Sequence, residues 1–194
     1  MENSSIKNIM VVGTGGQGVI LASEILVDVA LYSGLDAKKS EIHGMSQRGG
    51  VVTSHVRYGE KVFSPLMLEG TADILLSFEL AEAARWLPCL SENGRVITST
   101  QKIVPPVVST GLASYPDNAD AIIREKTQNS IIVDALAIAS ELGNPRLVNT
   151  ILLGIVSTLL DLPLDKWEEV VAQRVPPKFK ELNMEAFARG REQQ

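Results

Sequence analysis

The sequence is poor in the side chains that bind metals through sulfur or imidazole. Its 194 residues include one cysteine, Cys89, and two histidines, His43 and His55. A single thiol cannot form an intrachain disulfide, and it cannot supply the four thiolates of a zinc site or an iron–sulfur cluster. Two histidines also disfavour a histidine-rich metal site. We therefore expect this chain to bind no metal.

Positive charge is scarce as well. The sequence has 18 Lys and Arg against 23 Asp and Glu, which gives a formal net charge of -5. Proteins that bind nucleic acid neutralise phosphates with clustered basic side chains. The composition therefore argues against a nucleic-acid partner.

The sequence also lacks a long apolar run. Its most apolar segment, residues 151–160, contains Gly154, Ser157 and Thr158, and it is much shorter than the roughly 20 residues that cross a bilayer. The polar N-terminus does not show the charged, apolar and small-residue regions of a signal peptide. We expect a cytoplasmic protein that does not bind a membrane.

The sequence alternates between short apolar runs and segments whose apolar residues recur at helical spacing. This pattern predicts an α/β, Rossmann-like fold with a mainly parallel sheet flanked by helices. With 45% hydrophobic residues the chain can bury a core, and no linker or repeat divides it. We predict one domain over residues 1–194, in which residues 163–194 form a C-terminal helical extension. The predicted strands are 9–12, 36–40, 51–58, 73–78, 95–100 and 131–133, and the predicted helices are 19–32, 79–87, 118–127, 135–142, 147–160 and 165–173.

Three segments have more specific expectations. The alternating strand 51–58 precedes a turn, so residues 61–64 are expected to return antiparallel as a β-hairpin. The helix 147–160 is apolar almost all round, which indicates either a central position in the core or cover from a partner subunit. Residues 178–191 are expected to form a charged tail with helical content.

A glycine-rich loop between the first predicted strand and helix is the strongest local motif. Gly13, Gly15 and Gly18 satisfy the spacing G-x-G-x-x-G, and Gly16 and Gln17 lie between them. Such glycines permit a tight turn, and the free N–H groups at the helix start favour an anion such as a phosphate. The loop is therefore either a nucleotide or phosphate site or a structural turn.

Known phosphate-binding motifs match this loop only in part. It is not a Walker A loop, because Val19 and Ile20 stand where Lys and Ser or Thr are required. A dinucleotide site needs an acidic residue about 20 positions further on to hold the ribose. Asp36 and Glu41 are the candidates, but neither lies at a clear strand end.

A second loop, residues 41–50, combines a carboxylate, an imidazole, an amide, a guanidinium and three glycines. Arg48, followed by Gly49, is placed to reach the carboxylate or phosphate of a ligand, or else to pair with a buried acid and fix the loop. The imidazole of this loop belongs to His43, and histidine side chains often act as metal ligands or as acids and bases. Because no second ligand or base accompanies it, we expect His43 to be a hydrogen-bonding residue.

Four further side chains are of interest. Glu79 follows a buried strand, at the carboxyl end of the sheet where α/β sites usually lie. Asn149 is expected to be a helix N-cap or an inward polar contact. Cys89 is expected to be a small buried residue, and His55 a structural one. No Ser-His-Asp order, carboxylate pair or activated nucleophile is evident, so no catalytic residue is assigned.

The motifs also occur in an informative order. The sequence contains residues 13–18 (GTGGQG), then 41–50 (EIHGMSQRGG), then 54–57 (SHVR). This ordered set resembles the gamma subunit or domain of 2-oxoacid:ferredoxin oxidoreductases, and the likeness continues through residues 73–76 and 149–154. The HGMSQRGG form is most similar to the beta subunit of the indolepyruvate:ferredoxin oxidoreductase branch.

The resemblance implies a role within a larger enzyme. Such enzymes oxidatively decarboxylate a 2-oxoacid to an acyl-CoA and reduce ferredoxin. The family's thiamine pyrophosphate, magnesium and [4Fe-4S] clusters lie on other subunits or domains, which agrees with the single cysteine here. We therefore expect a partner subunit that carries these groups, contact with ferredoxin through the complex, and no activity of this chain alone.

The glycine loop then has one of two roles. Either it contributes to binding the phosphate-rich part of coenzyme A, or it only supports the subunit interface. Two other functions fit the residues, namely a free-standing Rossmann-type NAD-binding enzyme and a purely structural interaction module. The residues assigned to the coenzyme A or interface loop are Gly13, Gly15, Gly16, Gln17, Gly18, Arg48 and Gly49.

Overall fold

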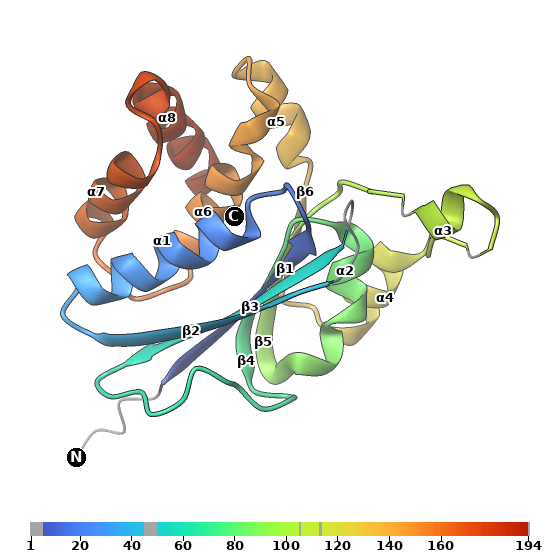
Figure 1. Cartoon of the computed structure of the whole chain (residues 1–194), viewed down its shortest axis with the longest axis horizontal. Coiled ribbons are helices and arrows are strands. Elements are labelled where there is room, and N and C mark those ends of the chain that lie inside the picture. The colour runs from blue at the N-terminus through green and yellow to red at the C-terminus, as the bar shows by residue number, and fades with distance from the viewer. Residues whose placement is uncertain (1–5, 45–49, 105, 113, 194) are drawn as a thin grey trace.

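The computed structural model describes residues 6–44, 50–104, 106–112 and 114–193. In this part of the chain the strands form one six-stranded sheet in the order β2-β3-β1-β4-β5-β6 (Figure 1). The strands are β1 (Lys7–Thr14), β2 (Asp36–His43), β3 (Val51–Gly59), β4 (Ala72–Ser77), β5 (Leu90–Ser99) and β6 (Ser130–Val133). The predicted α/β fold is confirmed.

The sheet is mixed rather than uniformly parallel. The neighbours β1 and β4, β4 and β5, and β5 and β6 pair in parallel. In contrast, β3 runs antiparallel to both β1 and β2. The parallel prediction therefore holds for four strands, and an antiparallel pair forms one edge of the sheet.

The predicted β-hairpin between residues 51–58 and 61–64 does not form. β3 pairs with the preceding strand β2, and residues 61–64 form no strand. The backbone of this segment bonds to side chains instead. The N–H of Val62 donates to Oδ2 of Asp36 at 2.9 Å, and Nη1 of Arg57 donates to the carbonyl of Ser64 at 2.8 Å. Because these polar groups are satisfied by side chains, the segment does not need to extend the sheet.

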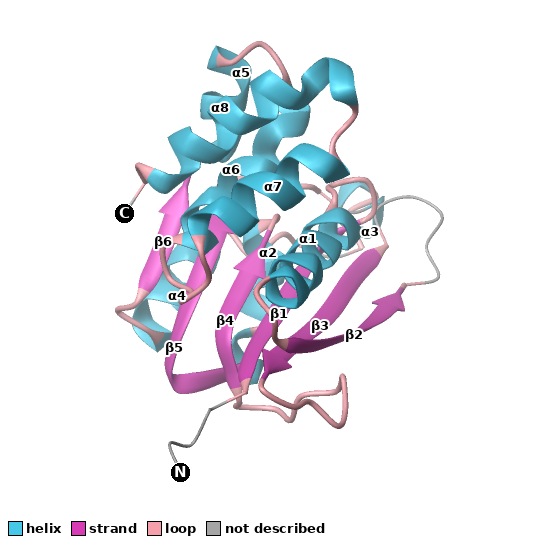
Figure 2. Ribbon diagram, turned by 90° about the vertical axis from the view of Figure 1, so that its left-hand side faces the viewer, coloured by secondary structure: helices cyan, strands magenta, loops and turns pink. Residues whose placement is uncertain are grey.

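Helices cover both faces of the sheet (Figures 1 and 2). One face carries α1 (Val19–Tyr32), α5 (Ala135–Glu141), α6 (Val148–Ser157), α7 (Leu164–Arg174) and α8 (Lys180–Arg191). The other face carries α2 (Leu80–Arg85) and α4 (Ala119–Lys126). The short helix α3 (Pro106–Ser109) lies in a segment that projects to one side (Figure 1). Within the described ranges, no helix combines the length and the apolar character needed to cross a bilayer.

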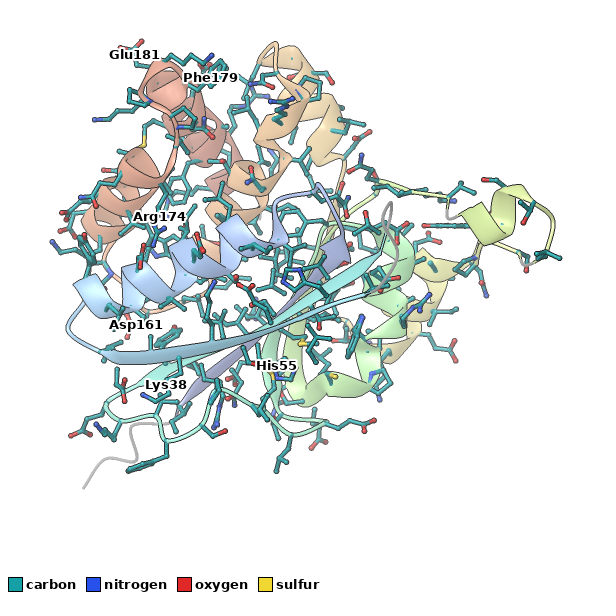
Figure 3. The ribbon with its side chains drawn as sticks, in the orientation of Figure 1. Lys38, His55, Asp161, Arg174, Phe179 and Glu181 are labelled. Carbon is teal, nitrogen blue, oxygen red and sulfur yellow. The ribbon has the colours of Figure 1, made fainter. Side chains whose placement is uncertain are left out.

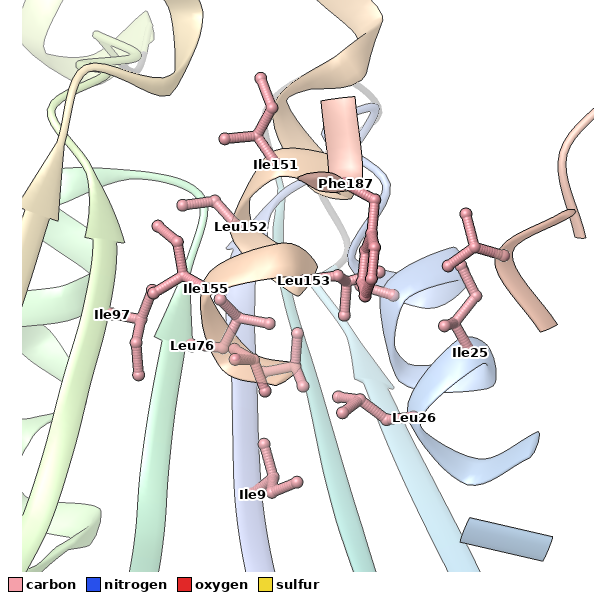
Figure 4. Close-up of a cluster of buried hydrophobic side chains, with 14 of the residues drawn as sticks. Ile9, Ile25, Leu26, Leu76, Ile97, Ile151, Leu152, Leu153, Ile155 and Phe187 are labelled. Atoms are coloured by element: carbon pink, nitrogen blue, oxygen red, sulfur yellow. The ribbon is translucent and has the colours of Figure 1, made fainter. Parts of the chain in front are cut away.

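Helix α6 forms the centre of the larger core. All of its residues from Val148 to Ser157 are buried. Figure 4 shows its side chains among those of β4, β5, α1 and α8. The apolar surface of α6 is thus covered by its own chain, which is the central position that was one of the two predicted alternatives.

The C-terminal segment has the predicted helical content, in α8, but it belongs to this core instead of forming a charged tail. Trp167 of α7 and Phe187 of α8 are buried, and their ring centroids lie 6.0 Å apart. A Cβ atom on Gly154 would lie 2.3 Å from the carbonyl oxygen of Phe187, and one on Gly190 would lie 2.0 Å from that of Ile151. Helices α6 and α8 therefore meet backbone to backbone, where only glycine fits.

We expect Gly190→Ala to lower the free energy of unfolding by about 1–3 kcal/mol, the usual cost of overpacking. Helix propensity alone would act in the opposite direction by about 1 kcal/mol, so the sign of the change tests the contact. Urea unfolding followed by circular dichroism measures it. The control is Glu185→Ala at an exposed position of α8, with an expected change within about 0.5 kcal/mol. A Gly190→Ala variant as stable as the natural protein would contradict the close approach.

Candidate functional site

The glycine loop joins the end of β1 to the start of α1 (Figure 1). Gly16 and Gly18 have φ values of +94° and +86°, in the left-handed region that favours glycine. Gly18 is the N-cap of α1, and no side chain caps this end of the helix. The first N–H groups of a helix have no acceptor within it and form the positive end of its dipole. The loop therefore presents an uncapped, anion-compatible helix start.

The side chain of Gln17 closes this loop from within. Its Oε1 accepts hydrogen bonds from the backbone N–H of Thr14 at 2.8 Å and from the Thr14 hydroxyl at 3.1 Å. Its Nε2 donates to the carbonyl of Phe78 at 2.8 Å and to Oε1 of Gln101 at 3.1 Å. A primary amide has two N–H donors, so both are used within the protein. Gln17 therefore fixes the shape of the loop.

Gly13 allows β1 and the start of α1 to pack closely. It is buried in β1. A Cβ atom there would lie 2.9 Å from both Oε1 of Gln17 and Cγ2 of Val19. The absence of a side chain at Gly13 thus leaves the room that the Gln17 amide occupies.

The two predicted loops are adjacent at this end of the sheet. The N–H of Gly15, which is exposed, donates to the carbonyl of Gly50 at 2.9 Å. Gly50 is the last residue of the second loop. Arg48 and Gly49, the other predicted residues of that loop, lie outside the described residues.

A pocket of about 830 Å³ opens beside the glycine loop. This volume is within the range of small-molecule sites. Its wall consists of the loop, the connection between α5 and α6, and the start of α8 with the residues before it. Its lining includes Gly16, Gln17 and Gly18, the apolar side chains of Leu21, Phe179 and Leu182, and the polar side chains of Arg146, Asn149 and Asn183.

Two buried asparagines are held in fixed orientations at this pocket. Oδ1 of Asn149 accepts from the N–H of Thr150 at 2.8 Å, and the Thr150 hydroxyl donates to Oδ1 of Asn183 at 2.7 Å. Nδ2 of Asn183 donates to the carbonyl of Phe179 at 2.9 Å. Nδ2 of Asn149 faces the loop, since a Cβ atom on Gly18 would lie 2.8 Å from it. Asn149 therefore makes the inward polar contact that was one of its two predicted roles.

Arg146 brings a positive charge to the same pocket. It lies in a short 3₁₀-helix, Pro145–Leu147, and its side chain is exposed. Among the described residues it forms no ion pair, in contrast to Arg174, which pairs with Asp28 and Glu24. A guanidinium beside an uncapped helix start and fixed amides suits a phosphate or carboxylate. No motif in the sequence marks Arg146 as a site residue.

The acidic residue that a dinucleotide site requires is not found at this pocket. Asp36 begins β2 at the end of the sheet opposite the glycine loop. A hydrogen bond from the N–H of Val62 and one from Lys38 lower the pKa of Asp36. Glu41 is separated from β1 by β3, and a hydrogen bond that it accepts from Lys39 lowers its pKa. Both carboxylates are thus engaged elsewhere, and the ribose-binding pattern is incomplete.

Glu79 does lie at the carboxyl edge of the sheet, where it has a structural role. Its Oε2 caps α2 by accepting from the N–H of Glu82 at 2.8 Å. Its Oε1 accepts from the N–H of Ile103 at 3.1 Å and from the hydroxyl of Tyr115. Burial and the Glu79 carboxylate raise the pKa of Tyr115. Glu79 therefore anchors the projecting segment that carries α3.

The remaining reactive side chains do not line the pocket. Exposed His43 lies 3.2 Å from Glu41, and Nδ1 of His55 accepts from the N–H of Met67 at 3.2 Å. Cys89 is half-buried, and burial raises the pKa of its thiol. In the part of the chain that the structure describes, no three His, Cys, Asp or Glu side chains gather as a metal site would require.

We expect Gln17→Leu to lower the free energy of unfolding by about 1–3 kcal/mol, because it leaves the N–H of Thr14 and the carbonyl of Phe78 without their partner. The Thr14 amide should also exchange its hydrogen at least about tenfold faster. Urea unfolding and hydrogen exchange measure these effects. Gln128→Leu, at an exposed turn, is the matched control. Unchanged exchange at Thr14 would show that Gln17 does not hold the loop.

Comparisons with known proteins agree with this fold. The family model described as pyruvate ferredoxin/flavodoxin oxidoreductase matches residues 8–193. The indolepyruvate oxidoreductase subunit IorB of Thermococcus kodakarensis is 40% identical over 188 residues, which cover 94% of this chain and 93% of that protein. The gamma subunit of the keto/oxoacid ferredoxin oxidoreductase of Geobacter sulfurreducens has the same fold, with a TM-score of 0.71, 26% identity and coverage of 96% and 97% of the two chains.

A longer protein contains this fold as one part. The 2-oxoglutarate:ferredoxin oxidoreductase of Magnetococcus marinus, solved with 2-oxoglutarate, coenzyme A and succinyl-CoA bound, matches with a TM-score of 0.75 over 96% of this chain and 30% of that one. At 18% identity this likeness concerns the fold alone. The family model, in contrast, spans almost the entire sequence, and the predicted resemblance is confirmed. The chain belongs to the pyruvate ferredoxin/flavodoxin oxidoreductase family.

Proposed function

We propose that this chain is the gamma-type subunit of a 2-oxoacid:ferredoxin oxidoreductase that acts on indolepyruvate. The observation that carries the proposal is the 40% identity to an indolepyruvate oxidoreductase subunit over nearly the full length of both chains. In the overall reaction, a 2-oxoacid is oxidatively decarboxylated to an acyl-CoA while ferredoxin is reduced.

The proposal requires a partner subunit. One cysteine cannot ligate a [4Fe-4S] cluster within this chain. The clusters that carry electrons would therefore lie on the partner. Thiamine pyrophosphate with its magnesium ion, which supplies the carbanion chemistry, would lie there too, as the family resemblance implies. Ferredoxin would be reached through the same complex. This chain would act in the cytoplasm as part of that assembly.

The pocket beside the glycine loop suits the phosphate-rich part of coenzyme A. The N–H groups at the start of α1 and the guanidinium of Arg146 would bind phosphate oxygens. The apolar side chains of Leu21 and Phe179 and the fixed amide of Asn149 offer surroundings for the adenine ring. The protein's own contribution is to bind and orient this substrate rather than to transfer protons or electrons.

The two alternative functions are less well supported. A free-standing NAD-binding enzyme lacks its ribose-binding acid, because Asp36 lies at the opposite end of the sheet and Glu41 lies beyond β3. A purely structural module would have no need of a pocket of about 830 Å³ lined by Arg146, which pairs with no carboxylate of the described residues. The kinetic experiment described next distinguishes a purely structural module from one that binds coenzyme A.

We expect the isolated chain to be inactive and to restore indolepyruvate-dependent ferredoxin reduction when it is mixed with its thiamine-dependent partner. In that complex, Arg146→Ala should raise the KM for coenzyme A about tenfold, which corresponds to roughly 1.4 kcal/mol of lost binding. The kcat and the KM for indolepyruvate should stay unchanged. Steady-state kinetics with each substrate varied in turn measures these constants.

The matched control is Arg124→Ala, which removes an exposed arginine from α4 on the other face of the sheet. It should leave all three constants unchanged. If Arg146→Ala and Arg124→Ala behave alike, coenzyme A does not contact this pocket. A mixed complex with no activity would instead contradict the subunit assignment itself.

A further inference from the structure

The pocket beside the glycine loop lies where three helices begin. Its lining includes the N-cap residues of α1, α6 and α8, which are Gly18, Leu147 and Phe179. None of these residues has a side chain that can accept a hydrogen bond from the helix it precedes. The start of a helix carries a partial positive charge, so three such charges act on this pocket.

Acidic side chains are kept out of the pocket wall. The described residues that line it include Arg146 but no Asp or Glu, although the formal net charge of the chain is -5. Figure 3 shows Phe179 and Glu181 at the start of α8. Phe179 lines the pocket, whereas Glu181 is exposed and does not. The local charge of the pocket therefore favours an anionic ligand.

Asn149 adds a buried hydrogen-bond donor to this wall. The residue is only 8% exposed. Its Oδ1 accepts from the N–H of Thr150 at 2.8 Å and from the Thr150 hydroxyl at 3.3 Å. Its Nδ2, in contrast, donates to no group among the described residues. Because a buried donor without an acceptor costs about 1–3 kcal/mol, an acceptor atom of a ligand would be stabilised at this position.

The orientation of the Asn149 amide is fixed by its neighbour. A backbone N–H can only donate, so the atom that faces the N–H of Thr150 is the oxygen and the other is the nitrogen. Nδ2 lies against the start of α1, since a Cβ atom on Gly18 would be 2.8 Å from it. The first N–H groups of α1 have no acceptor within the helix. The amide donor and these backbone donors therefore lie together at one side of the pocket.

We propose that Asn149 is a specificity-determining residue of the coenzyme A site, and that its Nδ2 donates to a phosphate oxygen held at the start of α1. This inference rests on the proposed function. Several donors beside one helix start suit an acceptor with a negative charge and many lone pairs, which describes a phosphate group. The N–H donors of an amide lie in its plane, so the face of the same amide is left for the adenine ring.

The test uses the assembled complex with Asn149→Asp. This change keeps the oxygen that accepts from Thr150 and replaces only the donor Nδ2 by a carboxylate oxygen. We expect the KM for coenzyme A to rise about a hundredfold, because a hydrogen bond to a charged group is lost and two like charges meet. The kcat and the KM for indolepyruvate should not change. Steady-state kinetics with each substrate varied in turn measures these constants.

A neutral variant, Asn149→Leu, separates the loss of the donor from the added charge. It should raise the KM for coenzyme A about tenfold, as expected for one hydrogen bond to a charged group. Circular dichroism checks that both variants fold. The matched control, Asn93→Asp, makes the same amide-to-carboxylate change at an exposed position near the start of β5, at the other end of the sheet. It should leave all three constants unchanged.

An unchanged KM for coenzyme A in Asn149→Leu would overturn the proposed hydrogen bond, even if Asn149→Asp binds coenzyme A poorly. Changes of kcat or of the indolepyruvate KM as large as that of the coenzyme A KM would overturn it in favour of a purely structural role. If only Arg146→Ala raises the KM for coenzyme A, the role of Asn149 is wrong and the proposed site remains. If neither Arg146→Ala nor the Asn149 variants raise it, both proposals for this pocket are wrong.

Discussion

The carboxamide of Gln17 is the group on which the candidate site depends. It ties the glycine loop to Thr14 at the end of β1, to Phe78 beyond β4 and to Gln101 beyond β5. Gly13 leaves room for it, and the positive φ values of Gly16 and Gly18 bring the chain around it. Because the amide is satisfied by protein partners, the helix start stays free of side chains. The anion-compatible pocket is a consequence of this closed loop.

The two ends of the sheet have different features. At the carboxyl end of β1, fixed amides, the start of α1 and Arg146 surround the pocket. At the other end, Arg57 and His55 hold a loop whose apolar side chains face solvent. A rigid sheet with α6 and α8 packed through Gly154 and Gly190 connects the two.

The sequence predicted the features that depend on local periodicity. The order of strands and helices, the glycine turn and the buried apolar helix followed from spacing alone, and the family motifs identified the relatives. It did not predict contacts between distant segments. Arg146 and Asn183 reach the glycine loop only because α6 and α8 pack side by side, and residues 61–64 form no strand because Asp36 and Arg57 satisfy their backbone. Gln17 was correctly placed in the loop, but its partners Phe78 and Gln101 are more than 60 positions away.

We propose that this chain contributes a binding site for coenzyme A to a larger enzyme that holds the redox groups elsewhere. A cryo-electron microscopy structure of the assembled oxidoreductase with coenzyme A tests it most directly. We expect phosphate density beside Gly16–Gly18 and Arg146, with thiamine pyrophosphate and the clusters on the partner. Coenzyme A bound entirely by the partner subunit, with this pocket empty, would contradict it.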